Sequence, residues 1–176
     1  MIDHIKCTSI AKRFQFEWVF RELNYQLESD QIYGILGPNG SGKSTFLKII
    51  SGFTTPTKGD IKYNFQGRSF NQSEIFQYIA YTAPYIDLIE EMTVNELINF
   101  HHKMRPFPNF DLLKNEIKSF PFKNLLSKRI YELSSGMKQR IKLVTAILSG
   151  AKILLLDEPG SNLDVPASQW WQELLE

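Results

Sequence analysis

The chain has 176 residues, of which 43% are hydrophobic and 22% charged, and its formal net charge is +1. This length suits one domain that buries about two-thirds of its unfolded surface, and the balanced charge gives no sign of the basic field of a nucleic-acid binder. Cys7 is the only cysteine, which excludes an internal disulfide, argues against a zinc cluster and fits a reducing compartment.

The first third of the chain is predicted to be β-structure followed by a helix. Apolar and polar residues alternate through residues 2–36, which predicts several short strands with breaks. The last of them, residues 32–36, is short, mostly apolar and runs into a glycine-rich loop. Residues 43–51 follow as a helix, for which Gly52 is a suitable stop.

The middle of the chain is predicted to form a small helical insertion, residues 85–132. Two strands precede it, over residues 59–63 and 78–83. Thr93-Val94-Asn95-Glu96 has the spacing of a capping box, which predicts a helix through about Lys103. A second helix is expected over residues 111–118.

The last third of the chain completes an α/β pattern. Residues 136–148 carry apolar side chains at helical spacing, and residues 170–175 read as an amphipathic helix. Between them, residues 153–156 (Ile-Leu-Leu-Leu) form a continuous apolar run, as expected for a central parallel strand covered on both faces.

The loop from residue 37 to residue 44 matches the phosphate-binding pattern Gly-x-x-x-x-Gly-Lys-Ser in full. Its glycines allow backbone amides to turn toward a phosphate, and the following helix presents free N–H groups and the positive end of its dipole. Lys43 would supply a cation for the β- and γ-phosphates, and the Ser44 hydroxyl a ligand for Mg²⁺. The predicted nucleotide-binding residues here are Gly37, Pro38, Asn39, Gly40, Ser41, Gly42, Lys43, Ser44 and Thr45.

Asp157 and Glu158 directly follow the apolar run 153–156. A carboxylate at the C-terminal end of a buried parallel strand emerges where ligands bind in open α/β sheets. We expect Asp157 to hold Mg²⁺, directly or through water, and Glu158 to orient and deprotonate the attacking water. Glu158 and Lys43 are therefore the predicted catalytic residues.

Residues 133–140 (Leu-Ser-Ser-Gly-Met-Lys-Gln-Arg) resemble the signature of ABC ATP-binding cassettes, usually L-S-G-G-Q followed by a basic helix. The serines also make a plain helix N-cap, and such a helix N-terminus can receive a phosphate. Residues 158–164, which end in Ser-Asn-Leu-Asp, resemble the D-loop of the same family. The four motifs stand in the family's order, and the resemblance covers nearly the whole chain. It adds these nucleotide contacts to the prediction: Ser134, Ser135, Gly136 and Asp164.

The resemblance implies a fold, cofactors and an assembly. The expected fold is α/β, with a P-loop NTPase core, a mainly parallel sheet, an N-terminal antiparallel β subdomain and the helical subdomain 85–132, all in one ATP-binding domain over residues 1–176. Two ATP molecules with Mg²⁺ would lie in a head-to-tail dimer, formed with a second copy or with another cassette. In this family an aromatic residue near the N-terminus stacks on adenine. Phe14 falls at that place, and Phe16 or Trp18 could serve instead.

Two departures from the family pattern bear on catalysis. Pro84 stands where the family has a glutamine that touches magnesium and couples the site to the membrane partner, and proline has no side-chain donor or acceptor. A water, Thr82 or Tyr85 could take that place. The chain ends at Glu176, before a strand and a γ-phosphate-contacting histidine of the family, so the C-terminal strands are expected to be missing. The signature itself differs at two positions, with modest expected consequences.

The sequence thus predicts the ATP-hydrolysing subunit of an ABC transporter. No stretch approaches the roughly 18 apolar residues needed to span a bilayer, and the N-terminus lacks the pattern of a secretory signal. We expect a cytoplasmic chain, peripheral on the cytoplasmic face of the membrane, that binds an integral membrane subunit and no nucleic acid. The alternatives are a non-transport ABC ATPase acting in translation or DNA repair, and a non-hydrolysing nucleotide-binding regulatory module.

Overall fold

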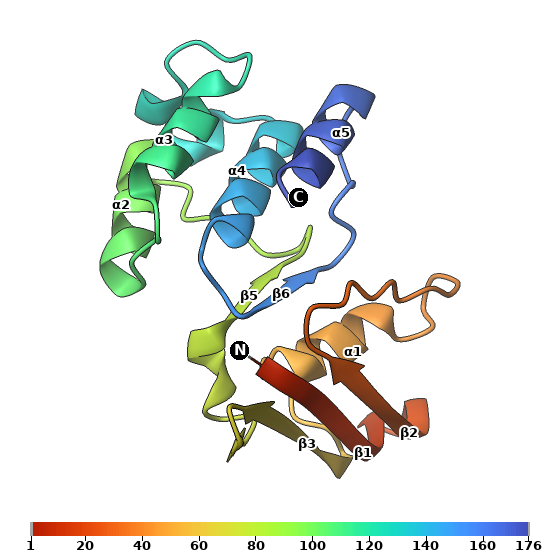
Figure 1. Ribbon diagram of the computed structural model, residues 1–176. Helices are drawn as coiled ribbons and strands as arrows, with labels where there is room; N and C mark the ends of the chain where they lie inside the picture. Colours follow the sequence, from red (N-terminus) through yellow and green to blue (C-terminus); the bar gives the residue numbers. More distant parts are fainter. Residues whose placement is uncertain (1, 176) are drawn as a thin grey trace. The chain divides into compact units, whose positions relative to one another are not determined.

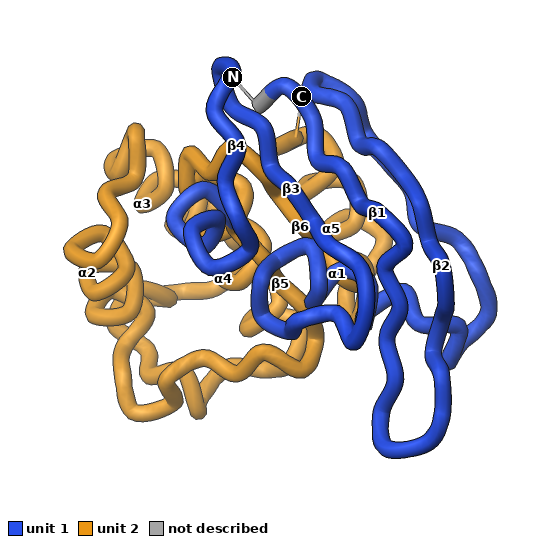
Figure 2. The backbone as a smooth tube through the Cα atoms, turned by 90° about the horizontal axis from the view of Figure 1, so that it is seen from below, with its two compact units in different colours: residues 1–79 blue, residues 80–176 orange. Residues whose placement is uncertain are grey.

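The computed structural model describes residues 2–175 and divides into two compact units, one ending at Ile79 and the other beginning at Ala80 (Figure 2). The first unit is built on a four-stranded antiparallel sheet with strand order β2-β1-β3-β4. The expected N-terminal antiparallel sheet is therefore present. The elements of this unit are β1 (Ile2–Phe14), β2 (Glu17–Glu28), α1 (Lys43–Ile50), β3 (Lys58–Phe65), β4 (Arg68–Phe70) and the 3₁₀ helix η1 (Ile75–Tyr78).

The prediction of several short strands at the N-terminus is wrong, because β1 and β2 form one long hairpin. The pairing is not uniform, since its register shifts between Cys7 and Ile10 and twice more before Arg13. Ser9 lies within the first shift and adopts a left-handed φ of 47°. Bulges of this kind interrupt the alternation of side chains while the backbone remains paired, which is why the sequence reads as broken strands.

The predicted strand at residues 32–36 is also absent. This segment has no regular secondary structure, and the side chains of Ile32 and Leu36 are 94% and 93% exposed. It follows Asp30, whose left-handed φ of 55° turns the chain away from β2. The backbone N–H of Glu28 donates to the Tyr33 hydroxyl (2.8 Å). Strand propensity is realised only against a paired neighbour, and the described residues offer this segment no such pairing.

The second unit contains a two-stranded sheet and a group of helices. Figure 1 shows β5 and β6 side by side with their arrows pointing the same way, and the pair is joined where the N–H of Asp157 donates to the carbonyl of Thr82 (2.9 Å). The predicted run 153–156 is confirmed as a strand with the same bounds. The elements are β5 (Ile79–Thr82), α2 (Val94–Met104), α3 (Phe110–Ser119), η2 (Leu125–Ser127), η3 (Ile130–Glu132), α4 (Ser135–Ile147), β6 (Ile153–Leu156) and α5 (Val165–Glu173).

The helices α2, α3 and α4 share one apolar core. Their inward-facing side chains are buried at helical spacing, and Phe120 packs edge-to-face on Trp170 of α5 with ring centroids 4.9 Å apart. The fully buried members of this core are Val94, Ile98, Leu113, Ile117, Ile130, Ile141 and Val144. Among the described helices, none combines the length and the apolarity needed to cross a bilayer.

The capping box predicted at Thr93 is confirmed. The Thr93 hydroxyl accepts from the backbone N–H of Glu96 (3.1 Å), and the Glu96 carboxylate accepts from the N–H of Thr93 (2.8 Å). Thr93→Ala is expected to lower the free energy of unfolding by about 1 kcal/mol, because it leaves a first-turn N–H without its partner. Urea denaturation measures this, and Thr55→Ala, which changes an exposed loop threonine, should stay within about 0.5 kcal/mol of the parent. Equal stability of the two variants would contradict the role of the cap.

Candidate functional site

The lysine of the predicted phosphate loop is hydrogen-bonded to the backbone of the same loop. The Lys43 Nζ donates to the carbonyl oxygens of Gly37 (2.9 Å) and Pro38 (2.8 Å), and the N–H of Ser41 donates to the same Pro38 carbonyl (3.2 Å). An ammonium has three donors, so one remains for a ligand once these two bonds are made. The lysine is thus fixed at the mouth of the loop, and the loop is folded around a positive charge.

The helix α1 begins directly after this loop, and no side chain caps it. Its N-cap is Gly42, which adopts a left-handed φ of 97°. A Cβ at this position would lie 2.5 Å from the Val19 Cγ1 of β2, so both the backbone angle and the close approach require glycine. The first-turn residues Ser44 and Thr45 therefore present an open helix N-terminus, which favours an anion.

Phe14, Phe16 and Trp18 lie around the turn of the β1–β2 hairpin. Phe16 is 92% and Phe14 54% exposed. The Trp18 ring is approached by the cationic groups of Arg13 and Arg21, at 5.3 and 4.6 Å from its centroid. The Lys12 Nζ likewise lies 5.0 Å from the centroid of the Phe14 ring, so cations approach both Phe14 and Trp18. The adenine contact of Phe14 stays a prediction.

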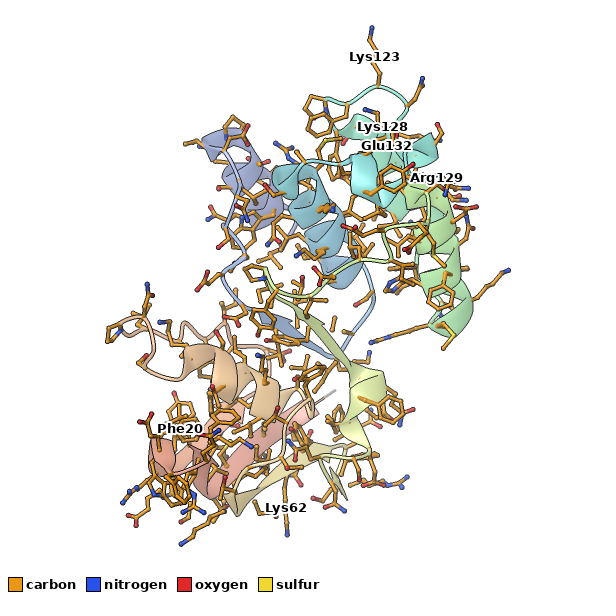
Figure 3. The ribbon with its side chains drawn as sticks, turned by 180° about the vertical axis from the view of Figure 1, so that it is seen from behind. Phe20, Lys62, Lys123, Lys128, Arg129 and Glu132 are labelled. Carbon is orange, nitrogen blue, oxygen red and sulfur yellow. The ribbon has the colours of Figure 1, made fainter. Side chains whose placement is uncertain are left out.

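An apolar cavity of about 380 Å³ adjoins the phosphate loop within the first unit. It is lined by the alternate β2 side chains Leu23, Tyr25 and Leu27 together with Phe20 (labelled in Figure 3). The segment 33–36 and Ser41, Gly42 and Lys43 complete the lining. The apolar residues of the segment that forms no strand thus line a hollow beside the loop. The period-two pattern of Leu23, Tyr25 and Leu27 is the sequence signal for this wall.

Asp157 and Glu158 follow β6 in the second unit and differ in their surroundings. Asp157 is 4% exposed, and its Oδ2 accepts from the Tyr85 hydroxyl (2.9 Å) and lies 3.5 Å from the Tyr81 hydroxyl. The two tyrosine hydroxyls also hydrogen-bond to each other. Burial raises the pKa of Tyr81 to about 12 and raises the pKa of Tyr85 as well, so both stay protonated near neutral pH. Each hydroxyl has one proton to donate, so Tyr85 donates to the carboxylate and Tyr81 donates to the Tyr85 hydroxyl.

Glu158 is exposed and sits on a strained turn. Its φ is 46°, in the left-handed region that non-glycine residues rarely adopt. The Ser161 N–H donates to its carbonyl (3.0 Å), and the Ser161 hydroxyl donates to its Oε2 (3.1 Å). The turn therefore directs the two adjacent carboxylates differently, one buried and one toward solvent, as their separate predicted roles require.

The surroundings of Asp157 suit a Mg²⁺ ion that shares its coordination with water and phosphate better than a metal ion coordinated by protein side chains alone. Among the described residues there is no cluster of three or more His, Cys, Asp or Glu side chains that could hold a metal ion. Mg²⁺ is usually bound by one or two carboxylates together with waters and substrate phosphates. The Tyr85 hydroxyl bonds to Oδ2 of Asp157, which leaves the other carboxylate oxygen for a cation or its water.

The signature segment forms the N-terminus of α4. Ser134 is the N-cap, and its hydroxyl accepts from the N–H of Met137 (3.3 Å). Ser135 is the first residue of the helix. A Cβ on Gly136 would lie 2.8 Å from the carbonyl oxygen of Asn162. A glycine is therefore needed here because the D-loop segment passes directly against the signature.

Two side chains of α4 join it to the segment after β6. The Gln139 amide donates to the carbonyl of Pro159 (3.1 Å), with Gln139 only 1% exposed. The Arg140 guanidinium pairs with the Asp164 carboxylate (3.1 Å), which also caps α5 by accepting from Ala167 (3.0 Å). Asp164 is thus committed to contacts within the chain, and its predicted contact with nucleotide stays a prediction.

Known proteins share this sequence and fold. The model of the family described as ABC transporter matches residues 20–161. The chain belongs to this family. Among curated ABC transporter relatives, the ATP-binding protein YcbN of Bacillus subtilis is 28% identical over 160 residues, 91% of this chain and 52% of YcbN. The lipoprotein-releasing system ATP-binding protein LolD of Buchnera aphidicola is 30% identical over 175 residues, 91% of this chain and 75% of LolD. The chain therefore spans about half the length of YcbN.

Solved ABC structures confirm the α/β fold with a P-loop NTPase core. A putative ABC transporter ATP-binding protein from Pyrococcus furiosus has a TM-score of 0.81 at 22% identity, with 98% of this chain and 84% of that one covered. The ATP-binding cassette MJ0796, solved as a dimer in a post-hydrolysis state with ADP and phosphate, has a TM-score of 0.81 at 20% identity, covering 97% and 81%. At these identities the likeness concerns the fold alone.

Sequence reasoning missed the side chains that surround Asp157. Tyr85 is one of the three groups that could take the place of the glutamine, and nothing in the sequence points to Tyr81. The sequence gives little indication of these contacts, because two tyrosines four residues apart at the end of a strand are common in a protein core. Their meeting with Asp157 depends on the pairing of β5 with β6, which joins positions 72 and 76 residues apart.

Proposed function

We propose that this chain is the ATP-binding and ATP-hydrolysing subunit of an ABC transporter. The observation that carries the proposal is the phosphate loop, whose lysine is fixed at the mouth and whose following helix begins uncapped. That arrangement is built to receive the phosphates of a nucleotide, and membership in the ABC transporter family connects nucleotide binding with transport. The bound nucleotide is ATP with Mg²⁺.

The proposed roles of the site residues follow from the sequence motifs to which they belong. Lys43 binds the β- and γ-phosphates, Ser44 and Asp157 hold Mg²⁺, and Glu158 acts as the base toward the attacking water. Mg²⁺ supplies charge neutralisation at the phosphates when it is bound. The remaining nucleotide contacts are proposed to be Phe14, Gly37 to Gly42, Thr45, Ser134, Ser135, Gly136 and Asp164.

The proposed assembly is a head-to-tail dimer on the cytoplasmic face of a membrane. The serine-capped N-terminus of α4 at Ser134 supports it, because the first turn of a helix can receive the γ-phosphate of a nucleotide bound by a second cassette. The helical residues 85–132, part of a single ATP-binding domain, would face an integral membrane subunit. No nucleic acid takes part.

Three measurements on the 176-residue chain test the proposal: ATP binding, recovery of a membrane protein and release of phosphate from ATP. Calorimetric titration with ATP in the presence of Mg²⁺ should give saturable binding with one site per chain, whereas the absence of binding at millimolar ATP would overturn the function. Pull-down from solubilised membranes should recover an integral membrane protein. Recovery of ribosomes or DNA in its place would favour a non-transport ABC ATPase, and binding without phosphate release would favour the regulatory module.

A further inference from the structure

Lys142 is a buried cation that the proposed mechanism does not use. It lies on α4 and is 8% exposed, and burial lowers its pKa. Its Nζ donates to three backbone carbonyls of one loop, those of Ala83 (3.1 Å), Pro84 (3.0 Å) and Ile86 (3.2 Å). An ammonium has three donors, so this loop satisfies all of them.

The loop that Lys142 binds carries Tyr85. Three bonds to carbonyls on both sides of this residue fix the path of the backbone and hence the direction of its side chain. From there the Tyr85 hydroxyl reaches the Asp157 carboxylate (2.9 Å), and Tyr81 supports it from β5 by bonding to the same hydroxyl. A continuous chain of polar contacts thus runs from the middle of α4 to Asp157.

These contacts reach Asp157 from the segment in which Pro84 stands at the position of the family's glutamine. We propose that Tyr85 is a positioning residue for the Asp157 carboxylate, held in place by Lys142, and that together they set the orientation of the magnesium-binding oxygen. The proposal rests on the proposed function, since it concerns the metal that accompanies ATP. It gives this chain a positioning group in a place where its own sequence offers no glutamine.

The physical reason lies in the geometry that magnesium requires. Mg²⁺ accepts only near-ideal octahedral coordination at short distances, so a carboxylate that rotates freely is a poorer ligand than one that is fixed. A hydroxyl that donates to Oδ2 fixes the carboxylate plane and leaves Oδ1 as the free oxygen. Lys142 acts one step further away, because the direction of the tyrosine depends on a loop whose carbonyls would otherwise lack these bonds.

The test compares ATP affinity with and without the metal. ATP dissociation constants are measured by calorimetry in Mg²⁺ and in EDTA, and their ratio gives the enhancement of affinity by the metal. Tyr85→Phe, which removes only the hydroxyl, should reduce this enhancement about 3- to 10-fold, and Lys142→Met should reduce it in the same direction. Affinity in EDTA should stay at the parent value, because the phosphate loop is unchanged.

Matched controls separate positioning from a general loss of stability. Tyr131→Phe removes an exposed tyrosine hydroxyl, and Lys118→Met removes an exposed lysine charge; both should keep the parent enhancement. The ratio compares two constants of the same folded protein, so reduced stability alone does not change it. If Lys142→Met does not fold, Tyr85→Phe decides the matter by itself.

The outcomes distinguish this proposal from the proposed function. If Mg²⁺ increases the ATP affinity of Tyr85→Phe as much as that of the parent chain, the positioning role is overturned and the ATP-binding function remains intact. An equal reduction of the enhancement in Tyr85→Phe and in Tyr131→Phe would overturn it as well, because the loss would then not depend on the hydroxyl that contacts Asp157. Failure of the parent chain to bind ATP in either buffer removes the proposed function, and this inference with it.

Discussion

Lys43→Ala should weaken ATP binding by at least about a hundredfold. The ammonium is the cation at the mouth of the phosphate loop, and hydrogen bonds to charged groups contribute about 1.5–3 kcal/mol each. The substitution also removes the two bonds from Nζ to the carbonyls of Gly37 and Pro38. The loop then loses both its charge for the phosphates and the contacts that keep it folded around that charge.

Calorimetric titration with ATP measures the Lys43 effect, and the same helix provides a control. Lys48→Ala removes an identical charge from the last turn of α1 and should keep the affinity within about twofold, since a helix-end charge interacts weakly with a distant ligand. Circular dichroism should show both variants folded. Equal ATP affinity of Lys43→Ala and the parent would refute the assignment of the phosphate loop.

The features predicted correctly from the sequence are those that local chemistry decides. The capping box at Thr93 needs only residues three positions apart, and the strand 153–156 is bounded by its own run of apolar residues. The start of α1 at Lys43 and the cap at Ser134 are local in the same sense, because each depends on residues within a single turn and the helix that follows it.

The features that the sequence did not predict depend on partners far along the chain. The strand at residues 32–36 was predicted from its apolar composition, but a strand exists only where another pairs with it. The contacts from Lys142 to the loop at 83–86 join positions 56 to 59 residues apart. A lysine among the apolar positions of α4 gives no hint of which carbonyls it will meet.

Glu158→Gln is expected to slow ATP hydrolysis at least about a hundredfold while leaving ATP binding intact. Glutamine has the same shape as glutamate but cannot take a proton from water. The exposed side chain contacts Ser161, whose hydroxyl can bond equally to an amide. The strained turn at φ 46° should therefore survive the change, and any loss of rate reports on proton transfer.

The same variant should accumulate an ATP-bound dimer, because the step that consumes the bound nucleotide is blocked. Single-turnover phosphate release measures the rate, and light scattering with and without ATP measures the dimer. Glu173→Gln, an exposed carboxylate on α5, is the matched control and should behave as the parent in both. If Glu158→Gln turned over at the parent rate, the base would have to be another group. If the ATP-bound dimer still accumulated in that case, dimerisation and proton transfer would be separate steps in this chain. The glutamine would then affect association alone.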